Sequence, residues 1–179
     1  GNTVLAWSVN TPDCIERYEA GTAPLEKRLD TAAAASRAGY LVAFHFDPII
    51  LSCGTIHDYL DLADRVFASV DPGRVAWVSL GCFRYSPGFK DFARRTASCR
   101  GLTSPEMFPC EDGKYRYFRP LRMAVYGSLT RRIRSLAPGA FVYFCMESES
   151  VWREVMGARY RESDELEKAF NDHLKARFL

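Results

Sequence analysis

Four short apolar segments, none of which contains an Asp, Glu, Lys or Arg, limit what this chain can fold into. They are residues 3–9 (TVLAWSV), 40–46 (YLVAFHF), 75–80 (VAWVSL) and 141–145 (FVYFC). Strands that are apolar on both faces are typical of parallel sheets, because other elements cover both faces of such sheets. Helical patterns separate the four segments, and parallel strands need crossover connections of this kind. We therefore expect an α/β fold built on four parallel strands.

The stretches between the expected strands carry the start and stop signals of helices. Thr22 is a candidate N-cap, followed by Pro24 in the first turn and by Gly39 at the end of an alanine-rich stretch. Thr55 and Asp58 resemble a capping box at the start of a second helix. Further helices are expected over about 88–97, from Pro120 to about 136, around 151–155 and from Ser163 onward.

Four βα units of this kind fit either a small open sheet or half of a (β/α) barrel. In both architectures, ligands bind where the carboxyl ends of the strands meet. Polar residues follow all four expected strands of this chain. They are Ser8 and Asn10, His45 and Asp47, Ser79 and Arg84, and Glu147 and Ser148. The sequence therefore predicts a ligand site at this edge of the sheet.

Asp47 and Arg84 are the charged members of this set that suit a polar ligand best. The Asp47 carboxylate either accepts hydrogen bonds from a ribose hydroxyl or an amine, or shapes the turn before Pro48. The Arg84 guanidinium either binds a carboxylate or phosphate through two hydrogen bonds, or pairs with Asp47 or Glu147.

The uncharged members leave similar alternatives. His45 alternates with two phenylalanines, so it faces away from them, either into a pocket or as a hydrogen-bonded core histidine. Ser8 and Asn10 either bind a polar cofactor or satisfy the backbone of the following loop.

The net charge of +2 hides an uneven distribution of charged side chains. Residues 1–73 have 5 basic and 10 acidic side chains, residues 74–134 have 13 and 4, and residues 135–179 have 6 and 8. A basic middle third indicates either a polyanionic partner, usually nucleic acid, or a solvated basic surface.

Within this basic third, residues 114–122 (KYRYFRPLR) interleave basic and aromatic side chains. Such side chains contact phosphates and stack on bases; alternatively, they start a helix with packed aromatic residues and solvated arginines. The candidates for nucleic-acid contact are Lys114, Arg116, Tyr117, Arg119 and Arg122.

The six cysteines lie at positions 14, 53, 82, 99, 110 and 145. They form no CxxC pair, and together with the histidines they give no convincing metal site. Most lie in or beside apolar segments, so we expect reduced, buried thiols in a cytoplasmic protein rather than a disulfide scaffold. The sequence contains neither a signal peptide nor an apolar run long enough to span a membrane.

Several segments taken together resemble the C-terminal half of the spore photoproduct lyase family. They are WSVN with YEAGTAPLEKRLDTAAAASRAGY, then VAFHFDPII, WVSLGCFRYSP and CMESESVWREVMG, all within residues 3–157. Members of this family are radical S-adenosylmethionine (SAM) enzymes of DNA repair with a partial (β/α) barrel and a [4Fe–4S] cluster. The resemblance implies half of such a barrel over residues 1–157, followed by an amphipathic helix over residues 158–179. It implies a carbon–carbon lyase as the whole enzyme, with DNA and the N-terminal half of the barrel as partners.

The resemblance also implies cofactors and site residues. The family's cluster motif, CxxxCxxC, lies in its N-terminal half and is absent here, so we expect the cluster ligands upstream and the chain by itself to be inactive. The chain also opens directly on a strand without a methionine, which suggests a fragment. The residues expected to bind SAM are Ser8, Asn10, His45, Asp47 and Arg84.

Arg119 loosely matches an arginine that lies near the lesion in the family. Pro120 stands where the family has a tyrosine, so the substrate can differ from a thymine dimer. Two other functions remain open: a nucleic-acid-binding α/β module without catalysis, and an α/β domain that binds a metabolic ligand.

Overall fold

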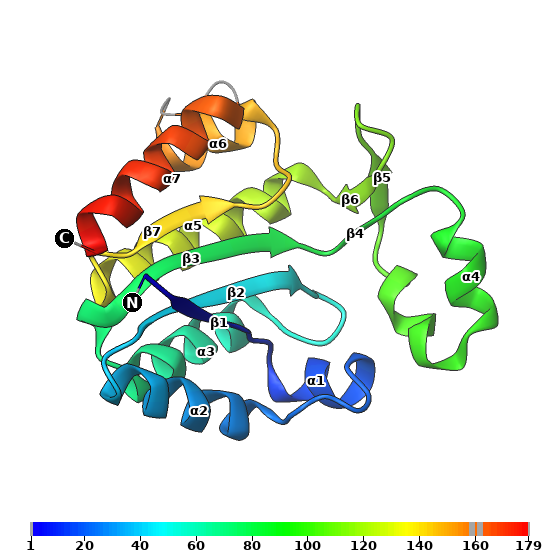
Figure 1. Cartoon of the computed structure of the whole chain (residues 1–179). Helices are drawn as coiled ribbons and strands as arrows, with labels where there is room; N and C mark the ends of the chain where they lie inside the picture. The colour runs from blue at the N-terminus through cyan, green and yellow to red at the C-terminus, as the bar shows by residue number, and fades with distance from the viewer. Residues whose placement is uncertain (1, 158–159, 161–162, 179) are drawn as a thin grey trace.

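The main sheet contains four strands, as the apolar segments predict. The computed structural model describes residues 2–157, 160 and 163–178, and Figure 1 shows its ribbon. The strands are β1 (Val4–Ser8), β2 (Leu41–Ile49), β3 (Val75–Cys82) and β7 (Phe141–Phe144). All neighbouring strands pair in parallel, in the spatial order β1-β2-β3-β7.

This strand order distinguishes between the two architectures that the sequence allows. In a doubly wound open sheet the order reverses at a switch point, whereas in a (β/α) barrel consecutive strands are neighbours throughout. The four strands here lie side by side in the order of the chain. The expectation of a partial (β/α) barrel is therefore confirmed.

The helices lie close to their expected positions. Thr55 caps α3 through a complete capping box with Asp58, as predicted. The alanine-rich helix α2 begins only at Leu25, with Pro24 rather than Thr22 as its N-cap, and the helix expected at Pro120 begins at Arg119. The α-helices are α1 (Pro12–Tyr18), α2 (Leu25–Arg37), α3 (Ile56–Ser69), α4 (Phe89–Arg95), α5 (Arg119–Leu136), α6 (Glu149–Met156) and α7 (Ser163–Phe178). Two 3-10 helices cover Pro72–Arg74 and Ala97–Thr103.

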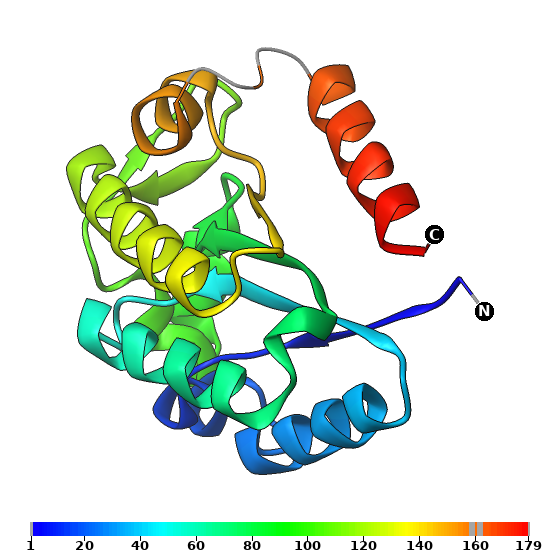
Figure 2. The same ribbon diagram turned by 90° about the vertical axis from the view of Figure 1, so that its left-hand side faces the viewer.

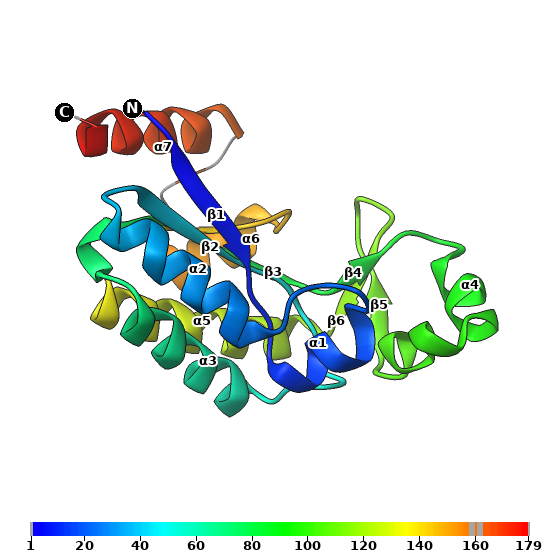
Figure 3. The same cartoon turned by 60° about the horizontal axis from the view of Figure 1, so that its bottom comes forward.

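Different helices cover the two faces of the main sheet. Phe44 of β2 contacts Phe67 of α3, with ring centroids 6.3 Å apart. Phe44 is in register with Val78 of β3, so the preceding residue of β3, Trp77, points to the other face. There Trp77 packs against Phe170 of α7, with centroids 5.3 Å apart. Figures 2 and 3 show α7 on one side of the sheet and α2, α3 and α5 on the other.

A small second sheet, which the sequence does not indicate, lies between β3 and α5 in the chain. Its strands are β4 (Arg84–Tyr85), β5 (Met107–Pro109) and β6 (Tyr115–Tyr117), paired antiparallel in the order β4-β6-β5. Strands of two or three residues are too short to show a period, and only the tertiary structure brings them together. The pairing stacks Tyr85 on Tyr115 at a centroid distance of 5.3 Å.

The cysteines correct one expectation. Cys14 and Cys53 form a disulfide, whereas Cys82, Cys99, Cys110 and Cys145 are free. The two partners are 39 residues apart in the sequence. They meet because the segments after the adjacent strands β1 and β2 reach the same edge of the sheet, which the spacing of cysteines does not reveal.

The C-terminal helix is the last described element. The boundary expected between residues 157 and 158 borders residues outside the described part of the chain, so the two-part division stays a prediction. None of the described helices has both the length and the apolar character needed to cross a membrane.

Candidate functional site

The carboxyl ends of the parallel strands carry a row of polar side chains. Ser8 is in register with His45, His45 with Ser79, and Ser79 with Tyr143. Residues in register on neighbouring strands point to the same face, which here is the face of Trp77 and α7. The structure thus brings Ser8 and His45 together, as predicted, and adds Tyr143 to them.

Asp47 and Arg84 form an ion pair just beyond this row. Arg84 Nη1 lies 3.1 Å from Asp47 Oδ1, and Nη2 lies 3.4 Å from Oδ2. A Cβ atom on Gly81 would lie only 2.6 Å from Asp47 Cγ, so this glycine leaves the space that the carboxylate fills. The predicted site residues Asp47 and Arg84 therefore contact each other directly. The peptide bond from Asp47 to Pro48 is cis.

Cys145 joins this ion pair from the end of β7. Arg84 Nη2 donates to Cys145 Sγ at 3.3 Å. Burial is the main cause that raises the pKa of the Cys145 thiol, and the neighbouring Asp47 raises this pKa further. The thiol is therefore protonated at neutral pH. Sequence reasoning missed this residue, although its place at the end of a strand is the same signal that singled out Glu147.

His45 is held in its uncharged form. Its Nδ1 lies 2.6 Å from Ser79 Oγ, and the side chain is half-buried. Burial lowers the pKa of His45, and the nearby Asp47 carboxylate only partly opposes this effect. At neutral pH the imidazole is therefore a neutral hydrogen-bonding group at this edge of the sheet. We call this edge the rim; it consists of Ser8, His45, Asp47, Ser79, Arg84 and Tyr143.

A cavity of about 450 Å³ opens beside the ion pair. Pockets of a few hundred Å³ are the usual size for small-molecule ligands. Aromatic side chains form much of its wall, with charged groups at its edge. Its lining residues are Asp47, Pro48, Phe83, Arg84, Tyr85, Ser86, Phe89 and Lys114. The sequence pointed to Asp47, Arg84 and Lys114 but not to the aromatic wall, because the short strand β4 and helix α4 place it.

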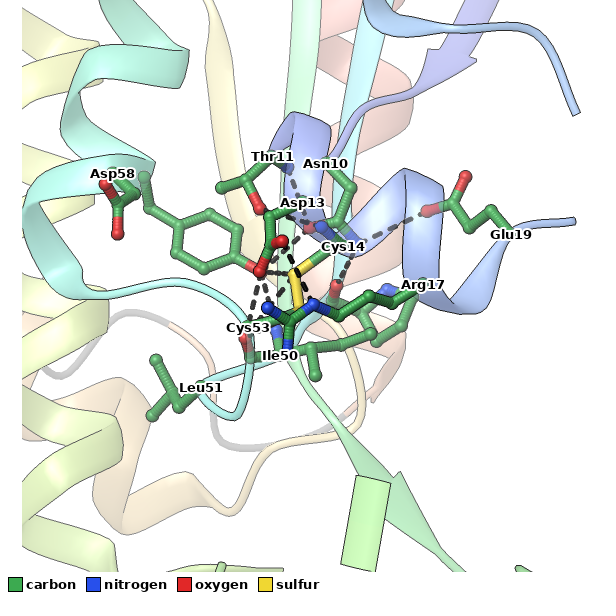
Figure 4. Close-up of a disulfide and its surroundings, with 12 residues drawn as sticks. Asn10, Thr11, Asp13, Cys14, Arg17, Glu19, Ile50, Leu51, Cys53 and Asp58 are labelled. Carbon is green, nitrogen blue, oxygen red and sulfur yellow. Dashed lines mark hydrogen bonds and ion pairs between the residues drawn. A yellow bond between two sulfur atoms is a disulfide. The ribbon is translucent and has the colours of Figure 1, made fainter. Parts of the chain in front are cut away.

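Asn10 lies behind the rim instead of on it. Its side chain is buried, donates to Pro48 O at 3.1 Å and to Glu19 Oε1 at 3.3 Å, and accepts from the Tyr59 hydroxyl at 2.8 Å. Figure 4 shows Asn10 close to the disulfide. These contacts support the backbone of the segment after β2. Ser8, in contrast, is exposed.

Three of the five residues predicted to face nucleic acid are buried. Arg116 donates to both oxygens of Asp112, at 2.6 and 2.7 Å. Tyr117 is fully buried. Arg122 forms a buried ion pair with Glu147, with Nε 3.0 Å from Oε1. In this conformation the three side chains hold β6 and α5 in place and offer little surface to a polyanion.

The other two residues lie nearer the surface. Lys114 lines the cavity, and Arg119 forms a half-exposed ion pair with Glu154. Next to Arg119, Phe118 is 55% exposed and contacts Phe108, which is 37% exposed, at a centroid distance of 5.4 Å. Exposed aromatic rings beside basic groups are the arrangement on which single-stranded nucleic acids stack.

No group of three or more His, Cys, Asp or Glu side chains in the described part of the chain is arranged to hold a metal ion. The free cysteines are dispersed over β3, the Ala97–Thr103 turn, the loop after β5 and the end of β7. They offer no set of three thiolates for an iron–sulfur cluster.

Comparison with known proteins agrees with this geometry. Residues 1–87 match the family model described as "Spore photoproduct lyase". The spore photoproduct lyase of Bacillus subtilis (strain 168) is 33% identical over 70 residues, which cover 39% of this chain and 20% of that protein.

Solved structures extend the likeness in fold. A mutant of spore photoproduct lyase superimposes with a TM-score of 0.61 and 22% identity, over 79% of this chain and 44% of that chain. A second mutant, solved with bound AdoMet and dinucleoside spore photoproduct, superimposes with the same TM-score over 81% and 45%. The chain spans less than half the length of these relatives. Residues 1–87, which contain β1 to β3 and most of the rim, are thus the part of the chain whose sequence is similar to the spore photoproduct lyase family.

Proposed function

We propose that this chain is the C-terminal portion of a radical SAM enzyme resembling spore photoproduct lyase, and that its rim binds SAM. The observation that carries the proposal is the meeting of His45, Asp47 and Arg84 at the carboxyl ends of strands homologous to that family. One structural relative was solved with bound AdoMet, which supports the same ligand here.

The chemistry of the rim fits the polar groups of SAM. Asp47 suits the amine or a ribose hydroxyl, and Arg84 suits the carboxylate. Without a ligand these two side chains neutralise each other, so a zwitterionic amino acid group can exchange their mutual contact for two contacts of its own. His45 adds a neutral imidazole, and the aromatic wall of the adjacent cavity suits a flat purine.

The iron–sulfur cluster does not fit the described residues. Bound SAM supplies hydrogen-atom abstraction only beside such a cluster, and this chain has neither a CxxxCxxC motif nor three convergent cysteines among the described residues. In this proposal the cluster ligands come from a segment outside this sequence. The role of this chain is to bind and orient ligands, and it is inactive by itself.

A cytoplasmic location and a nucleic-acid substrate belong to the same proposal. The four free cysteines are consistent with the first. Relatives solved with dinucleoside spore photoproduct support the second. Lys114 at the cavity and Arg119 beside the exposed phenylalanines are the side chains that we expect to face the nucleic acid.

Titration calorimetry with SAM tests the ligand directly. We expect Asp47→Asn and Arg84→Gln each to weaken binding by about tenfold or more, because each loses a charge-assisted contact. Arg132→Gln is the matched control, since Arg132 forms an exposed ion pair with Asp64 away from the rim. Unchanged affinity in both rim variants would reject the site.

Expression together with the upstream sequence tests the enzyme as a whole. Under anaerobic conditions we expect iron–sulfur absorption and release of 5′-deoxyadenosine. A colourless product that leaves SAM intact would reject the radical SAM assignment.

The exposed pair of Phe108 and Phe118 supports a second candidate, a nucleic-acid-binding module without catalysis. Binding of single-stranded DNA should then fall steeply as salt rises. It should weaken in Lys114→Gln and Arg119→Gln but not in Arg132→Gln. Absence of binding at low salt would exclude this candidate.

A further inference from the structure

The disulfide lies at the base of the segment that carries the candidate site. Cys14 is in the first turn of α1, and Cys53 is in the connection between β2 and α3 (Figure 4). The same connection begins just after Asp47 and Pro48, which line the cavity. The disulfide therefore links the connection after β2, which follows Asp47 and Pro48, to helix α1.

Hydrogen bonds around the disulfide converge on this segment. The Tyr59 hydroxyl accepts from Ile50 N at 2.7 Å and donates to Asn10 Oδ1 at 2.8 Å. Asn10 in turn donates to Pro48 O at 3.1 Å. Cys14 Sγ lies only 3.6 Å from the Tyr59 hydroxyl, so the disulfide is part of the packing that orders these contacts.

The two cysteines differ in their exposure to solvent. Cys14 is fully buried, whereas Cys53 is half-buried in the connection. A small dithiol therefore has easier access to Cys53 than to Cys14. Access of this kind helps to determine which sulfur a thiolate attacks in thiol–disulfide exchange.

The surroundings also accommodate the reduced form. Cys14 Sγ lies 3.6 Å and Cys53 Sγ 3.5 Å from the carbonyl oxygen of Ile50. As thiols, both sulfurs gain a hydrogen that can be donated to this acceptor. Reduction therefore gives each sulfur a possible acceptor, but the two sulfurs must move apart once the covalent bond is broken, which loosens the packing around Ile50.

We propose that Cys14 and Cys53 are a reversible thiol–disulfide site, and that their redox state controls the order of residues 47–53 and of the cavity wall. A thiolate of a cellular dithiol attacks Cys53 Sγ, the S–S bond breaks, and Cys14 leaves as a thiolate that takes up a proton. The second thiol of the dithiol then releases Cys53. Two electrons and two protons pass to the protein, and the dithiol becomes a disulfide.

The effect reaches the cavity through the backbone. Phe83 N donates to Ile49 O at 2.8 Å, and Phe83 and Pro48 both line the cavity. Loosening the connection after Ile49 therefore loosens one wall of the cavity. The inference does not depend on which ligand the cavity binds, so it stands or falls separately from the proposed function.

Thiol counting tests the redox site. After equilibration with oxidised glutathione and denaturation, we expect the four free cysteines to react with a thiol reagent. All six cysteines should react after treatment with dithiothreitol. A protein that still shows six reactive thiols in oxidised glutathione would overturn the proposal.

Amide hydrogen exchange tests the coupling to the rim. Reduction, and likewise Cys53→Ala, should speed exchange at Ile50, Leu51 and Phe83 by about tenfold or more, because these amides lose local protection. The amide of Cys145, bonded to Leu80 O at 2.8 Å, is the internal reference.

Cys110→Ser is the matched control, because Cys110 is free and distant in sequence from both partners. It should leave the exchange rates of the oxidised protein unchanged. Cys53→Ala alters the accessible partner and avoids a substitution at the fully buried Cys14. Equal exchange at the three amides in the oxidised and reduced proteins would overturn the proposed coupling.

Discussion

At the scale of single residues, the charged groups of the middle third divide into buried and exposed pairs. The Arg122–Glu147 pair is 6% and 3% exposed, and Glu147 also accepts from the Tyr126 hydroxyl at 2.9 Å. The Arg132–Asp64 pair is 44% and 40% exposed. Sequence counts treat these arginines alike, but removal of a buried partner leaves an uncompensated charge in the core.

Arg122→Met should therefore lower the free energy of unfolding by about 3–5 kcal/mol, as measured by urea denaturation. The double variant Arg122→Met/Glu147→Gln should recover part of this loss, because the glutamine is uncharged and still accepts from Tyr126. Arg132→Met should cost less than about 1 kcal/mol. Equal losses at the two arginines would contradict the burial that the structure shows.

The lowered pKa of His45 predicts that the stability of the fold depends on pH. Its pKa in the folded protein is lowered, chiefly by burial, from an ordinary value of 6.5. Below that pH the unfolded chain binds the proton more readily than the folded one, so unfolding becomes easier. The contribution of His45 to the free energy of unfolding is thus fully present above about pH 6.5. It is lost as the pH falls through the pKa that His45 has in the folded protein.

Urea midpoints at pH 7.5 and pH 5.5 measure this effect. His45→Gln should show a smaller loss between the two pH values than the wild-type chain. His57→Gln is the control, since His57 is exposed at the start of α3. An identical pH dependence in all three proteins would show that His45 does not contribute.

At the scale of elements, α7 has the least expected position. It lies on the side of the sheet opposite α2, α3 and α5 (Figure 2). Phe170 is its main anchor. The Phe170 ring lies 5.3 Å from Trp77, 5.5 Å from Phe141 and 5.9 Å from Tyr143. None of the α7 side chains that the structure describes is fully buried, so the helix depends chiefly on this aromatic cluster, beside polar contacts such as that of His173 Nε2 with Ala76 O at 2.8 Å.

Phe170→Ala should release α7 from the sheet. We expect a loss of about 1–3 kcal/mol, below the range for a fully buried phenylalanine, and a red shift of tryptophan fluorescence as Trp77 becomes exposed. Phe92→Ala is the control, because Phe92 is 56% exposed on α4. A fluorescence spectrum that stays at its wild-type position would show that α7 does not cover Trp77.

At the scale of the whole molecule, the parallel sheet and the second sheet contribute different parts of the candidate site. The main sheet supplies His45 and Asp47, whereas β4 and the segment around it supply Arg84 and the aromatic wall of the cavity. Figure 1 shows the second sheet and α4 extending from the carboxyl ends of β2 and β3. The cavity lies at this junction, where each of the two sheets provides only part of the lining.

The sequence by itself determined the main sheet, its parallel strands and the edge at which we place the candidate site. Apolar runs and polar strand ends are local patterns, and the alternation of strand side chains converts them directly into faces. His45, Asp47 and Arg84 were predicted as candidate site residues in this way.

Only the tertiary structure decided the partners of each side chain. The Cys14–Cys53 disulfide, the burial of Arg116, Tyr117 and Arg122, and the turning of Asn10 away from the rim all depend on contacts between distant segments. A residue's type and neighbours in sequence do not reveal whether its charge will meet a buried counter-ion or solvent. The free energy of burying it, which depends on that partner, is therefore a property of the fold.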